Sequence, residues 1–592
     1  VSVAGRQTVL SARSCVSGHL RPVTAVRSYL SGQGCSFTDV RSYRSGRLCP
    51  VNPMCPSAPM CLRLGRAFRS FEGGGCDARG RSAHSRALGP ARSDCADPAS
   101  APTRHRACND RVPDVSPDAP CSLPRTYSFM FDPSVYRARR RRLASSVSSG
   151  LILLFGNRES PMNAAANPYP FRQDSTMLYY TGLDEPGVDV VLDADDGSAT
   201  LYGSDPDLET TVWMGPQPSL ADRADAAGLP ETGSPSDLAD DLSTAIRGGR
   251  SVHFLRPYRE EHRRRLRSLL GITGGRTDDY ASTELTRAVI DQRSVKSEAE
   301  IRELEQAVAS TAAIHEYALS MARPGRRECE IAGLLSGLAR SRGGELSFQP
   351  TCSVHGEVLH NHDYTHTMAD GDLLLVDAGA TSPLHYAGDV TRVVPVGGSF
   401  NDRQRAVYDA VLDAQVTAIE QLEPGVPFRD VHLRAARVLT EHLTDLGLME
   451  GDPDAAVEAG AHALFFPHGL GHMLGLDVHD MEALGEDLVG YADDQERSDQ
   501  FGLDALRLAR PLEPGFVVTV EPGCYFIPPL IQTWREEARH TDFINYDVVA
   551  DFIGFGGIRI EDDVLITESG SRILGPRIPK SADEVEDAAT GS

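Results

Sequence analysis

Several carboxylates in the second half of the chain end apolar segments, a position from which they could bind a metal ion. Asp377 follows the apolar run 373–376, and Asp389 comes one short turn later. Glu521 ends a further apolar run, 517–520. Such runs predict buried strands, and a hairpin would bring Asp377 and Asp389 together. A single aspartate at a strand end is usually a cap or a turn former, so these residues point to a site only in combination.

A glycine-rich segment between these carboxylates carries three histidines. His468 and His472 lie four positions apart in Pro-His-Gly-Leu-Gly-His, and His479 follows. Two histidines at this spacing could share one face of a helix, as in zinc proteases. No glutamate follows the first histidine, however, and the glycines disfavour a helix. We expect irregular backbone that lines a cleft, because three histidines in so short a segment favour a site over satisfied core residues.

The fourth carboxylate, Glu561, is expected within a strand, with Arg559 two residues earlier on the same face. Buried carboxylates cost free energy unless a metal or a partner compensates their charge. Four carboxylates and one imidazole are a hard, oxygen-rich ligand set. Such a set favours Mn²⁺, with Zn²⁺, Co²⁺ and Fe²⁺ as alternatives, over a thiolate zinc site. Four acids exceed what one ion needs, so we predict two divalent ions that share bridging carboxylates.

Two helix pairs predict the framework around these residues. A capping box at Ser297 predicts a helix that ends at the Pro-Gly pair 324–325, with a second helix after it. A similar unit recurs, with helices over 402–422 and 428–446 that are again separated by Pro-Gly. The repeat of helix, Pro-Gly, helix and strands indicates a pseudo-duplicated α/β domain, for which we expect the range 295–578.

Residues 130–290 predict a smaller α/β domain ahead of this one. A basic run is followed by the apolar run 151–155, an order that resembles a signal peptide. The apolar run is short and no small-residue cleavage site follows it, so a first helix and then a buried strand is the better interpretation. Strands over 188–192 and 200–201 are expected around an Asp-Asp-Gly turn. We therefore expect a cytoplasmic protein.

The two ends of the chain differ from the rest in composition. Residues 1–127 are basic, rich in Ser, Arg, Gly, Pro and Cys, and show no sustained strand or helix period. Their cysteines are odd in number and match no zinc spacing. We expect a disordered or artefactual extension rather than a secreted disulfide module, because this composition cannot bury a core. Residues 579–592 are expected to form an acidic tail.

The overall composition excludes several classes of protein. The 592 residues are 41% hydrophobic, which allows a sizeable core, and their formal net charge is −24. That charge argues against a nucleic-acid binder. No apolar run is long enough to span a membrane. After residue 127 the cysteines are Cys329, Cys352 and Cys524, which suits a reduced enzyme rather than a disulfide scaffold.

Together these motifs resemble the Xaa-Pro aminopeptidase and prolidase group of the pita-bread metallopeptidases. The order Asp, Asp, His, Glu, Glu is highly specific for this group, and the resemblance covers nearly all of residues 130–592. The segments 171–182, 185–187 and 213–215 are similar to the group's amino-terminal domain. The resemblance implies an α/β fold in which a smaller aminopeptidase P-like amino-terminal domain precedes a pseudo-duplicated pita-bread catalytic domain.

The resemblance also implies a role for each site residue. Asp377 would bind one metal, His472 and Glu521 would bind the other, and Asp389 and Glu561 would bridge the two. Glu521 would also shuttle a proton. His360 and His479 would form the proline pocket, His468 and His479 would support the scissile carbonyl, and Arg559 would orient the bridging carboxylate. Tyr525 and Tyr386 match site tyrosines of the group, Tyr525 on the substrate side.

Two activities of this group fit the sequence. An Xaa-Pro aminopeptidase would release the residue that precedes proline from a peptide, whereas a dipeptidase (prolidase) would act on Xaa-Pro alone. We favour the aminopeptidase. Arg507 resembles a prolidase arginine whose planar guanidinium binds the carboxylate of the dipeptide, and an ordinary surface arginine is the alternative.

A non-catalytic pita-bread module that binds proteins is disfavoured, because such modules lose metal ligands and all five are present here. The expected substrates are proline-containing peptides, and neither nucleic acid nor a membrane is expected as a partner. We expect the chain to form a homodimer or a higher homo-oligomer.

Overall fold

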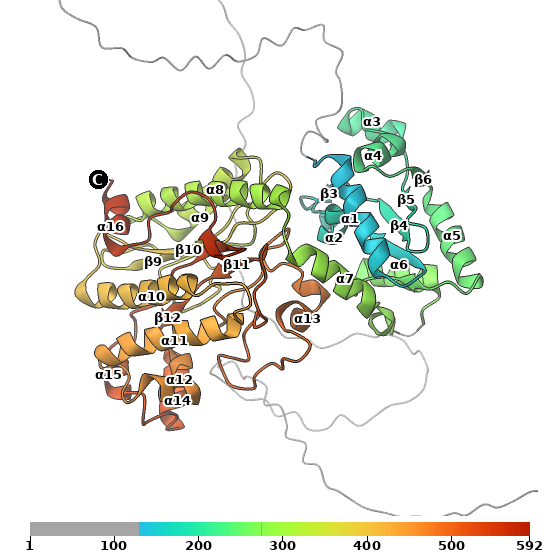
Figure 1. The fold of residues 1–592 in the computed structure, drawn as a ribbon. Helices are drawn as coiled ribbons and strands as arrows, with labels where there is room; N and C mark the ends of the chain where they lie inside the picture. Colours follow the sequence, from blue (N-terminus) through green and yellow to red (C-terminus); the bar gives the residue numbers. More distant parts are fainter. Residues whose placement is uncertain (1–129, 274, 592) are drawn as a thin grey trace, which may run out of the picture. The chain divides into compact units, whose positions relative to one another are not determined.

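A computed structural model of the protein describes residues 130–273 and 275–591 (Figure 1). The extension predicted over residues 1–127 lies outside the described residues. Within them, an amino-terminal α/β region is followed by a larger α/β region that carries the predicted site.

A five-stranded mixed sheet organises the amino-terminal region, with the strand order β6-β5-β4-β1-β7. Its strands are β1 (Leu151–Phe155), β4 (Asp189–Asp193), β5 (Ala199–Tyr202), β6 (Glu231–Gly233) and β7 (Val252–His253). β4 and β5 pair antiparallel, as the predicted Asp-Asp-Gly turn requires. β1 pairs with β4 on one side and β7 on the other, so this apolar run is a central strand buried along nearly its whole length.

Helices and one short hairpin complete the amino-terminal region. The helices are α1 (Pro133–Ser146), α2 (Ser175–Thr181), α3 (Leu208–Met214), α4 (Leu220–Ala227), α5 (Pro235–Arg247), α6 (Glu260–Leu270), η2 (Thr277–Tyr280) and α7 (Thr283–Ser294). The hairpin joins β2 (Pro161–Ala164) and β3 (Asn167–Pro168). α1 begins at an Asp132 cap and precedes β1, which confirms the predicted order of helix and then strand.

Two helix pairs frame the larger region, as the sequence repeat predicts. They are α8 (Glu298–Met321) with α9 (Glu328–Ser341), and α10 (Asp402–Glu420) with α11 (Phe428–Asp445). The capping box at Ser297 is present at the start of α8. Gly325 and Gly425, in the two Pro-Gly turns, have φ of 85° and 86°, a conformation that favours glycine.

Small antiparallel sheets within the described residues position the predicted ligands, of which Asp377 lies in a strand and the others lie beside strand ends or in loops. Their strand orders are β10-β9-β8, β11-β14-β15 and β12-β13. The strands are β8 (Thr351–Ser353), β9 (Leu373–Ala378), β10 (Val390–Pro395), β11 (Val517–Val520), β12 (Gly523–Tyr525), β13 (Gly557–Arg559), β14 (Asp562–Thr567) and β15 (Gly570–Ile573). β9 and β10 form the predicted hairpin, with Asp377 opposite Thr391.

Glu561 does not lie within a strand, contrary to the expectation from its apolar neighbours. It occupies the break between β13 and β14, where its backbone N–H donates to the carbonyl oxygen of Thr391 at 3.1 Å. The break lets the chain leave one sheet and enter another at the position of the ligand. The alternation of side chains between the two faces of a strand is the same in every sheet, so the sequence pattern does not reveal that the chain changes sheets.

The last residues of the chain form a helix where an acidic tail was expected. α16 (Ala582–Thr590) begins at a capping box and packs against α8, α10 and β10. Ala582, Val585 and Ala589 lie in the apolar core of the larger region. The acidic residues of its first turn are favourable at a helix amino terminus, so they do not oppose helix formation.

The remaining short helices contribute side chains to the apolar core of the larger region or pack against it. They are α12 (Pro453–Ala459), η3 (Ala461–Leu464), η4 (Glu482–Leu484), α13 (Glu486–Gly490), α14 (Pro528–Glu536) and α15 (Tyr546–Ala550). Among the helices of the described residues, none combines the length and the apolar composition that crossing a bilayer requires.

Arg392 of β10 ties the ligand strands to the end of the chain. Its guanidinium donates to the carbonyl oxygens of Glu561 at 2.6 Å and Pro579 at 2.9 Å, and to Asp562 Oδ1 at 2.6 Å. Lys580 Nζ donates to the other carboxylate oxygen of Asp562 at 2.7 Å. Burial raises the pKa of Asp562, but the two cations outweigh this effect and lower the pKa to about 2. Arg392 thereby holds the backbone of Glu561 in place.

We predict that Arg392→Ala destabilises the fold strongly, because it leaves the carboxylate of Asp562 buried with one cation fewer. The free energy of unfolding should fall by about 3–5 kcal/mol. The control is Arg326→Ala, which removes an exposed pair with Glu330 and should cost less than about 1 kcal/mol. Denaturant unfolding followed by circular dichroism measures both variants, and equal stabilities would contradict the structural role of Arg392.

Candidate active site

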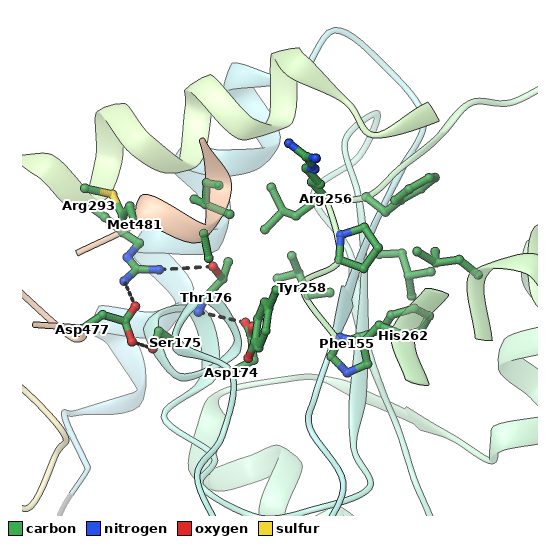
Figure 2. A pocket seen from close by; sticks show the side chains of 18 of the residues that line it. Phe155, Asp174, Ser175, Thr176, Arg256, Tyr258, His262, Arg293, Asp477 and Met481 are labelled. Atoms are coloured by element: carbon green, nitrogen blue, oxygen red, sulfur yellow. Dashed lines mark hydrogen bonds and ion pairs between the residues drawn. The ribbon is translucent and has the colours of Figure 1, made fainter. Parts of the chain in front are cut away.

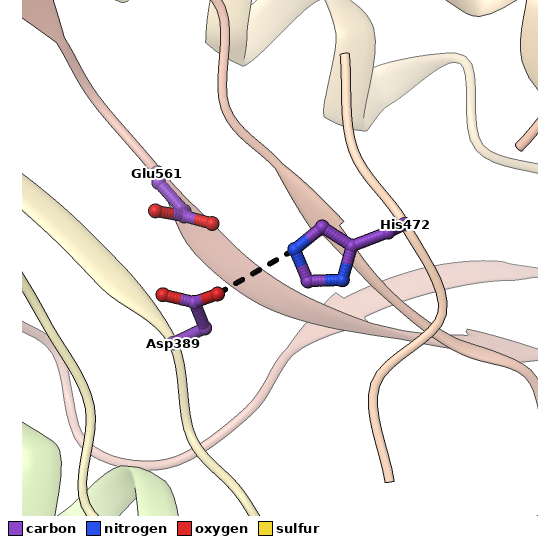
Figure 3. Close-up of side chains that lie close together, drawn as sticks. All are labelled: Asp389, His472 and Glu561. Carbon is purple, nitrogen blue, oxygen red and sulfur yellow. Dashed lines mark ion pairs between the residues drawn. The ribbon is translucent and has the colours of Figure 1, made fainter. Parts of the chain in front are cut away.

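Asp389, His472 and Glu561 converge in the interior of the larger region (Figure 3). Each offers one ligand atom, and the three atoms lie within 4.8 Å of one another. Asp389 immediately precedes β10, Glu561 immediately precedes β14, and His472 belongs to the glycine-rich segment. All three are buried. Two carboxylates and an imidazole at this spacing can bind one metal ion.

The backbone orients the ring of His472. Its Nδ1 lies 3.1 Å from the carbonyl oxygen of Met473, so Nδ1 carries the proton and donates it. Nε2 therefore has a free lone pair. This atom lies 3.5 Å from Asp389 Oδ2 and 3.6 Å from Glu521 Oε1. The lone pair faces the carboxylates, as a metal ligand requires.

Glycine allows the histidine segment to lie directly against β11. A Cβ on Gly471 would stand 2.1 Å from the carbonyl oxygen of Thr519. The N–H of His472 donates to Thr519 Oγ1, and the N–H of Thr519 donates to the carbonyl of His472, both at 3.0 Å. The predicted irregular backbone is present, and the close approach explains why the segment needs glycine.

One cavity of about 340 Å³ brings the five predicted ligands together. Asp377, Asp389, His472, Glu521 and Glu561 all line it. The other polar side chains that line this metal cavity include His360, His468, His479, Arg507 and Arg559. Residues from 360 to 561 therefore meet in a space large enough for a small peptide.

The buried carboxylates of the cavity favour the binding of a cation. Burial raises the pKa of Asp389 and of Glu561 well above the usual range, and neighbouring carboxylates add to the effect. Burial also raises the pKa of Glu521 to about 7. Oδ1 of Asp389 is buried and has no hydrogen-bond partner among the described residues. Divalent metal ions would satisfy this oxygen and offset the repulsion, so the residues present fit such ions.

Arg559 lines the cavity and supports two of the predicted ligands. Its guanidinium is buried, forms an ion pair with Asp377, and donates from Nε to Thr391 Oγ1 at 3.1 Å. Thr391 in turn donates from Oγ1 to Glu561 Oε2 at 2.6 Å. Arg559 thus orients Glu561 through Thr391, a residue that the sequence analysis did not identify. Its position two residues after Asp389 was the available signal, since both belong to the same hairpin.

His468 is joined to Arg559 by a buried tyrosine. Its Nδ1 donates to the carbonyl of Gly469 at 2.8 Å, and its Nε2 accepts from the hydroxyl of Tyr525 at 2.8 Å. The same hydroxyl accepts from Arg559 Nη1 at 2.8 Å. Burial, with the charge of Arg559, lowers the pKa of His468 to about 3, so the ring is neutral. Tyr525, expected on the substrate side, is buried and is not among the residues that line the cavity.

Tyr386 lies away from the metal cavity, although the resemblance matches it to a site tyrosine. Its hydroxyl donates to Glu300 Oε1 at 3.1 Å, and Glu300 Oε2 lies 3.2 Å from Arg139 Nη2. All three residues are buried. Tyr386 therefore helps to bury the charged pair formed by α1 and α8.

His360 and His479 occupy the cavity wall where the proline pocket is expected. The ring of His479 lies 4.2 Å from the ring of His472. Its Nδ1 lies 3.2 Å from Glu482 Oε2, a carboxylate that the sequence analysis did not consider. The separation of three residues was the signal that could have identified Glu482. Arg507 also lines the cavity, and its Nη1 lies 2.5 Å from Glu482 Oε2.

Figure 2 shows a second cavity, of about 270 Å³. It adjoins the metal cavity, since His479 lines both. Its apolar surface includes Phe155 and Met481. Arg293 stands at one side and donates to Thr176 Oγ1 at 3.2 Å. The space is bounded by the amino-terminal region and by the segment that follows His479.

Comparisons with known proteins agree with these features. The profile of metallopeptidase family M24 matches residues 302–568, and that of the aminopeptidase P N-terminal domain matches residues 136–253. The chain is 31% identical over 480 residues to a Homo sapiens Xaa-Pro dipeptidase, covering 76% of this chain and 91% of that protein. It is 30% identical over 462 residues to an Escherichia coli Xaa-Pro aminopeptidase, covering 76% and 96%.

Solved structures show the same similarity. The Pseudomonas aeruginosa aminopeptidase PepP superposes with a TM-score of 0.65 at 28% identity, over 78% of this chain and 99% of that one. A zinc-substituted Escherichia coli aminopeptidase P in complex with product gives 0.65 at 29% identity, with the same coverage. These matches confirm the predicted α/β fold with its amino-terminal and pita-bread domains.

We predict that Asp389→Asn removes most of the bound divalent metal, because it deletes the charge of a central ligand. Retention should fall at least about tenfold, the lower end of the loss seen when even an outer-shell partner is removed. Elemental analysis after dialysis measures this, with Asp363→Asn, an exposed aspartate, as the control. Wild-type metal content in Asp389→Asn would contradict the assignment.

Proposed function

Since the chain belongs to metallopeptidase family M24, we propose that it is an Xaa-Pro aminopeptidase that releases the residue preceding proline from peptides. The observation that carries this proposal is the meeting of the five predicted metal-ligand side chains with His360, His468 and His479 in one cavity. A dipeptidase that acts on Xaa-Pro alone is the second candidate, because the similar Homo sapiens protein is named as one. The same proposal includes a cytoplasmic location and self-association.

We propose that the cavity holds two divalent ions, most suitably Mn²⁺, because its donors are mainly carboxylate oxygens. Asp377 would hold one ion, and His472 with Glu521 the other. Asp389 and Glu561 would bridge them. Supporting observations are the unpartnered Oδ1 of Asp389 and the raised pKa of the buried carboxylates. Such ions would lower the pKa of water toward about 7 and polarise the scissile carbonyl.

The chain's own residues would position the peptide and move the proton. Glu521 would accept the proton of the attacking water and deliver it to the departing proline nitrogen, since its carboxylate lines the cavity. His360 and His479 would bound the proline ring. Both nitrogens of His468 are already engaged, so we assign it to holding Tyr525 and Arg559 in position. The second cavity beside His479 offers room for residues beyond proline.

We predict that the protein cleaves Ala-Pro-Ala and releases alanine, and that it hydrolyses Ala-Ala-Ala at least about 100-fold less efficiently. A discrimination of this size follows if the histidine-lined pocket orients the ring for attack, because misorientation alone costs about two orders of magnitude. Steady-state kinetics with amino acid analysis measures both peptides. Turnover of Ala-Pro without turnover of Ala-Pro-Ala would favour the dipeptidase instead.

We also predict that chelation removes activity and stability together. A ligand that binds only the folded state stabilises it by about 2.7 kcal/mol at a hundredfold excess over its dissociation constant, so EDTA should lower Tm. Adding Mn²⁺ back should restore both Tm and hydrolysis. Titration calorimetry on the metal-free protein should give two ions per chain, and a stoichiometry of one would contradict the two-ion proposal.

A further inference from the structure

Arg507 faces the metal cavity with its charge already neutralised. Its Nη1 lies 2.5 Å from Glu482 Oε2 and 3.3 Å from Glu486 Oε2. Both ion pairs use the same nitrogen, and among the described residues they are the ion pairs that Arg507 forms. Glu482 opens η4 and Glu486 opens α13, so two successive turns present carboxylates to one guanidinium.

The two carboxylates are not equivalent. Glu482 is largely buried, whereas Glu486 is more exposed and also pairs with Arg497. A charge pair that is shielded from water is worth more than an exposed one. Glu482 is therefore the principal partner of Arg507.

Glu482 also contacts the substrate side of the site. Its Oε2 receives both Arg507 Nη1 and His479 Nδ1, the latter at 3.2 Å. Burial raises the pKa of Glu482, but the hydrogen bond from His479 and the charge of Arg507 outweigh burial and lower it. Glu482 thus carries a negative charge between a histidine and an arginine that both line the cavity.

This arrangement bears on peptide length. In Xaa-Pro the carboxylate is attached directly to the proline ring, so it enters the site as a charge. In Xaa-Pro-Xaa the same position holds a neutral amide. A free arginine would bind the dipeptide carboxylate through a bidentate fork, whereas two nearby glutamates repel that carboxylate and compete for the guanidinium.

We propose that Glu482 determines substrate length, by occupying Arg507 and disfavouring a carboxylate directly on the proline. The inference rests on the proposed peptidase function and deepens it. Glu482 is the specificity-determining residue, and Arg507 is the group through which it acts. Peptides longer than Xaa-Pro are preferred because they do not compete with Glu482.

The test is Glu482→Gln, which removes the charge but keeps an oxygen that can accept from His479. The measured quantity is kcat/KM for Ala-Pro divided by kcat/KM for Ala-Pro-Ala. We expect this ratio to rise about tenfold, mainly through a lower KM for Ala-Pro, because a charge-assisted hydrogen bond becomes available to the dipeptide. Any general loss from a disturbed His479 affects both peptides and cancels in the ratio.

Two further variants separate the explanations. Glu482→Gln combined with Arg507→Ala should lose the gain, because no guanidinium remains to be released. Glu513→Gln removes a carboxylate that pairs with Arg510 at the surface of the same segment, and it should leave the ratio unchanged. Glu482→Ala provides the same test if Glu482→Gln does not fold.

The outcomes are distinct. A ratio that stays within about twofold of wild type in Glu482→Gln, or a gain that persists without Arg507, would overturn the inference. Equal losses on both peptides would show that Glu482 only positions His479, and they would also overturn it. If the wild-type protein cleaves neither peptide, the proposed function itself fails, whereas cleavage of Ala-Pro-Ala with an unmoved ratio refutes only the role of Glu482.

Discussion

Buried negative charge is the constraint on which the rest of the site depends. Asp377, Asp389, Glu521 and Glu561 line one cavity in the interior of the larger region. Burial, together with neighbouring carboxylates, raises the pKa of Asp389, Glu521 and Glu561 and favours their protonated forms. Divalent metal ions would compensate the negative charge while leaving a face open to a peptide.

The surrounding scaffold keeps these charges in place by means of buried arginines. Arg392 holds the backbone of Glu561 and the carboxylate of Asp562, whereas Arg559 pairs with Asp377 and reaches Glu561 through Thr391. A planar guanidinium suits both tasks because it donates several hydrogen bonds at fixed angles. The positions of these carboxylates are therefore fixed by the protein itself, which would keep the reorganisation needed for metal binding small.

Opposite charges also pair at the part of the cavity wall formed by His479 and Arg507, where we propose that substrate length is selected. His479 and Arg507 both line the cavity, and the single carboxylate of Glu482 contacts both. A relative named as a dipeptidase and one named as an aminopeptidase are almost equally similar to this chain. Overall similarity therefore does not separate the two activities, and local charge at the rim is the feature that can.

The sequence by itself determined the hairpin, the two helix pairs and the histidine-bearing loop, and it identified carboxylates and histidines that line one cavity. Each of these follows from a local pattern: an apolar run that ends in a carboxylate, a capping box, a Pro-Gly stop, or glycines that exclude a helix. The hairpin around Asp377 and Asp389 joins residues close in sequence, and glycine at Gly471 follows from a strict steric limit, although Thr519 also holds the backbone of His472. For this reason the order and spacing of these residues were sufficient to predict them.

Only the tertiary structure decided which long side chains meet. Tyr525 is buried where its hydroxyl joins His468 and Arg559, and Tyr386 lies elsewhere, where its hydroxyl donates a hydrogen bond to Glu300. The sequence did not indicate that Glu482 pairs with Arg507, or that the strand is interrupted at Glu561. Long side chains reach partners that are distant in sequence. Desolvation and charge then determine which of these partners are compatible with burial. A local pattern of apolar and polar residues carries no information about such pairs.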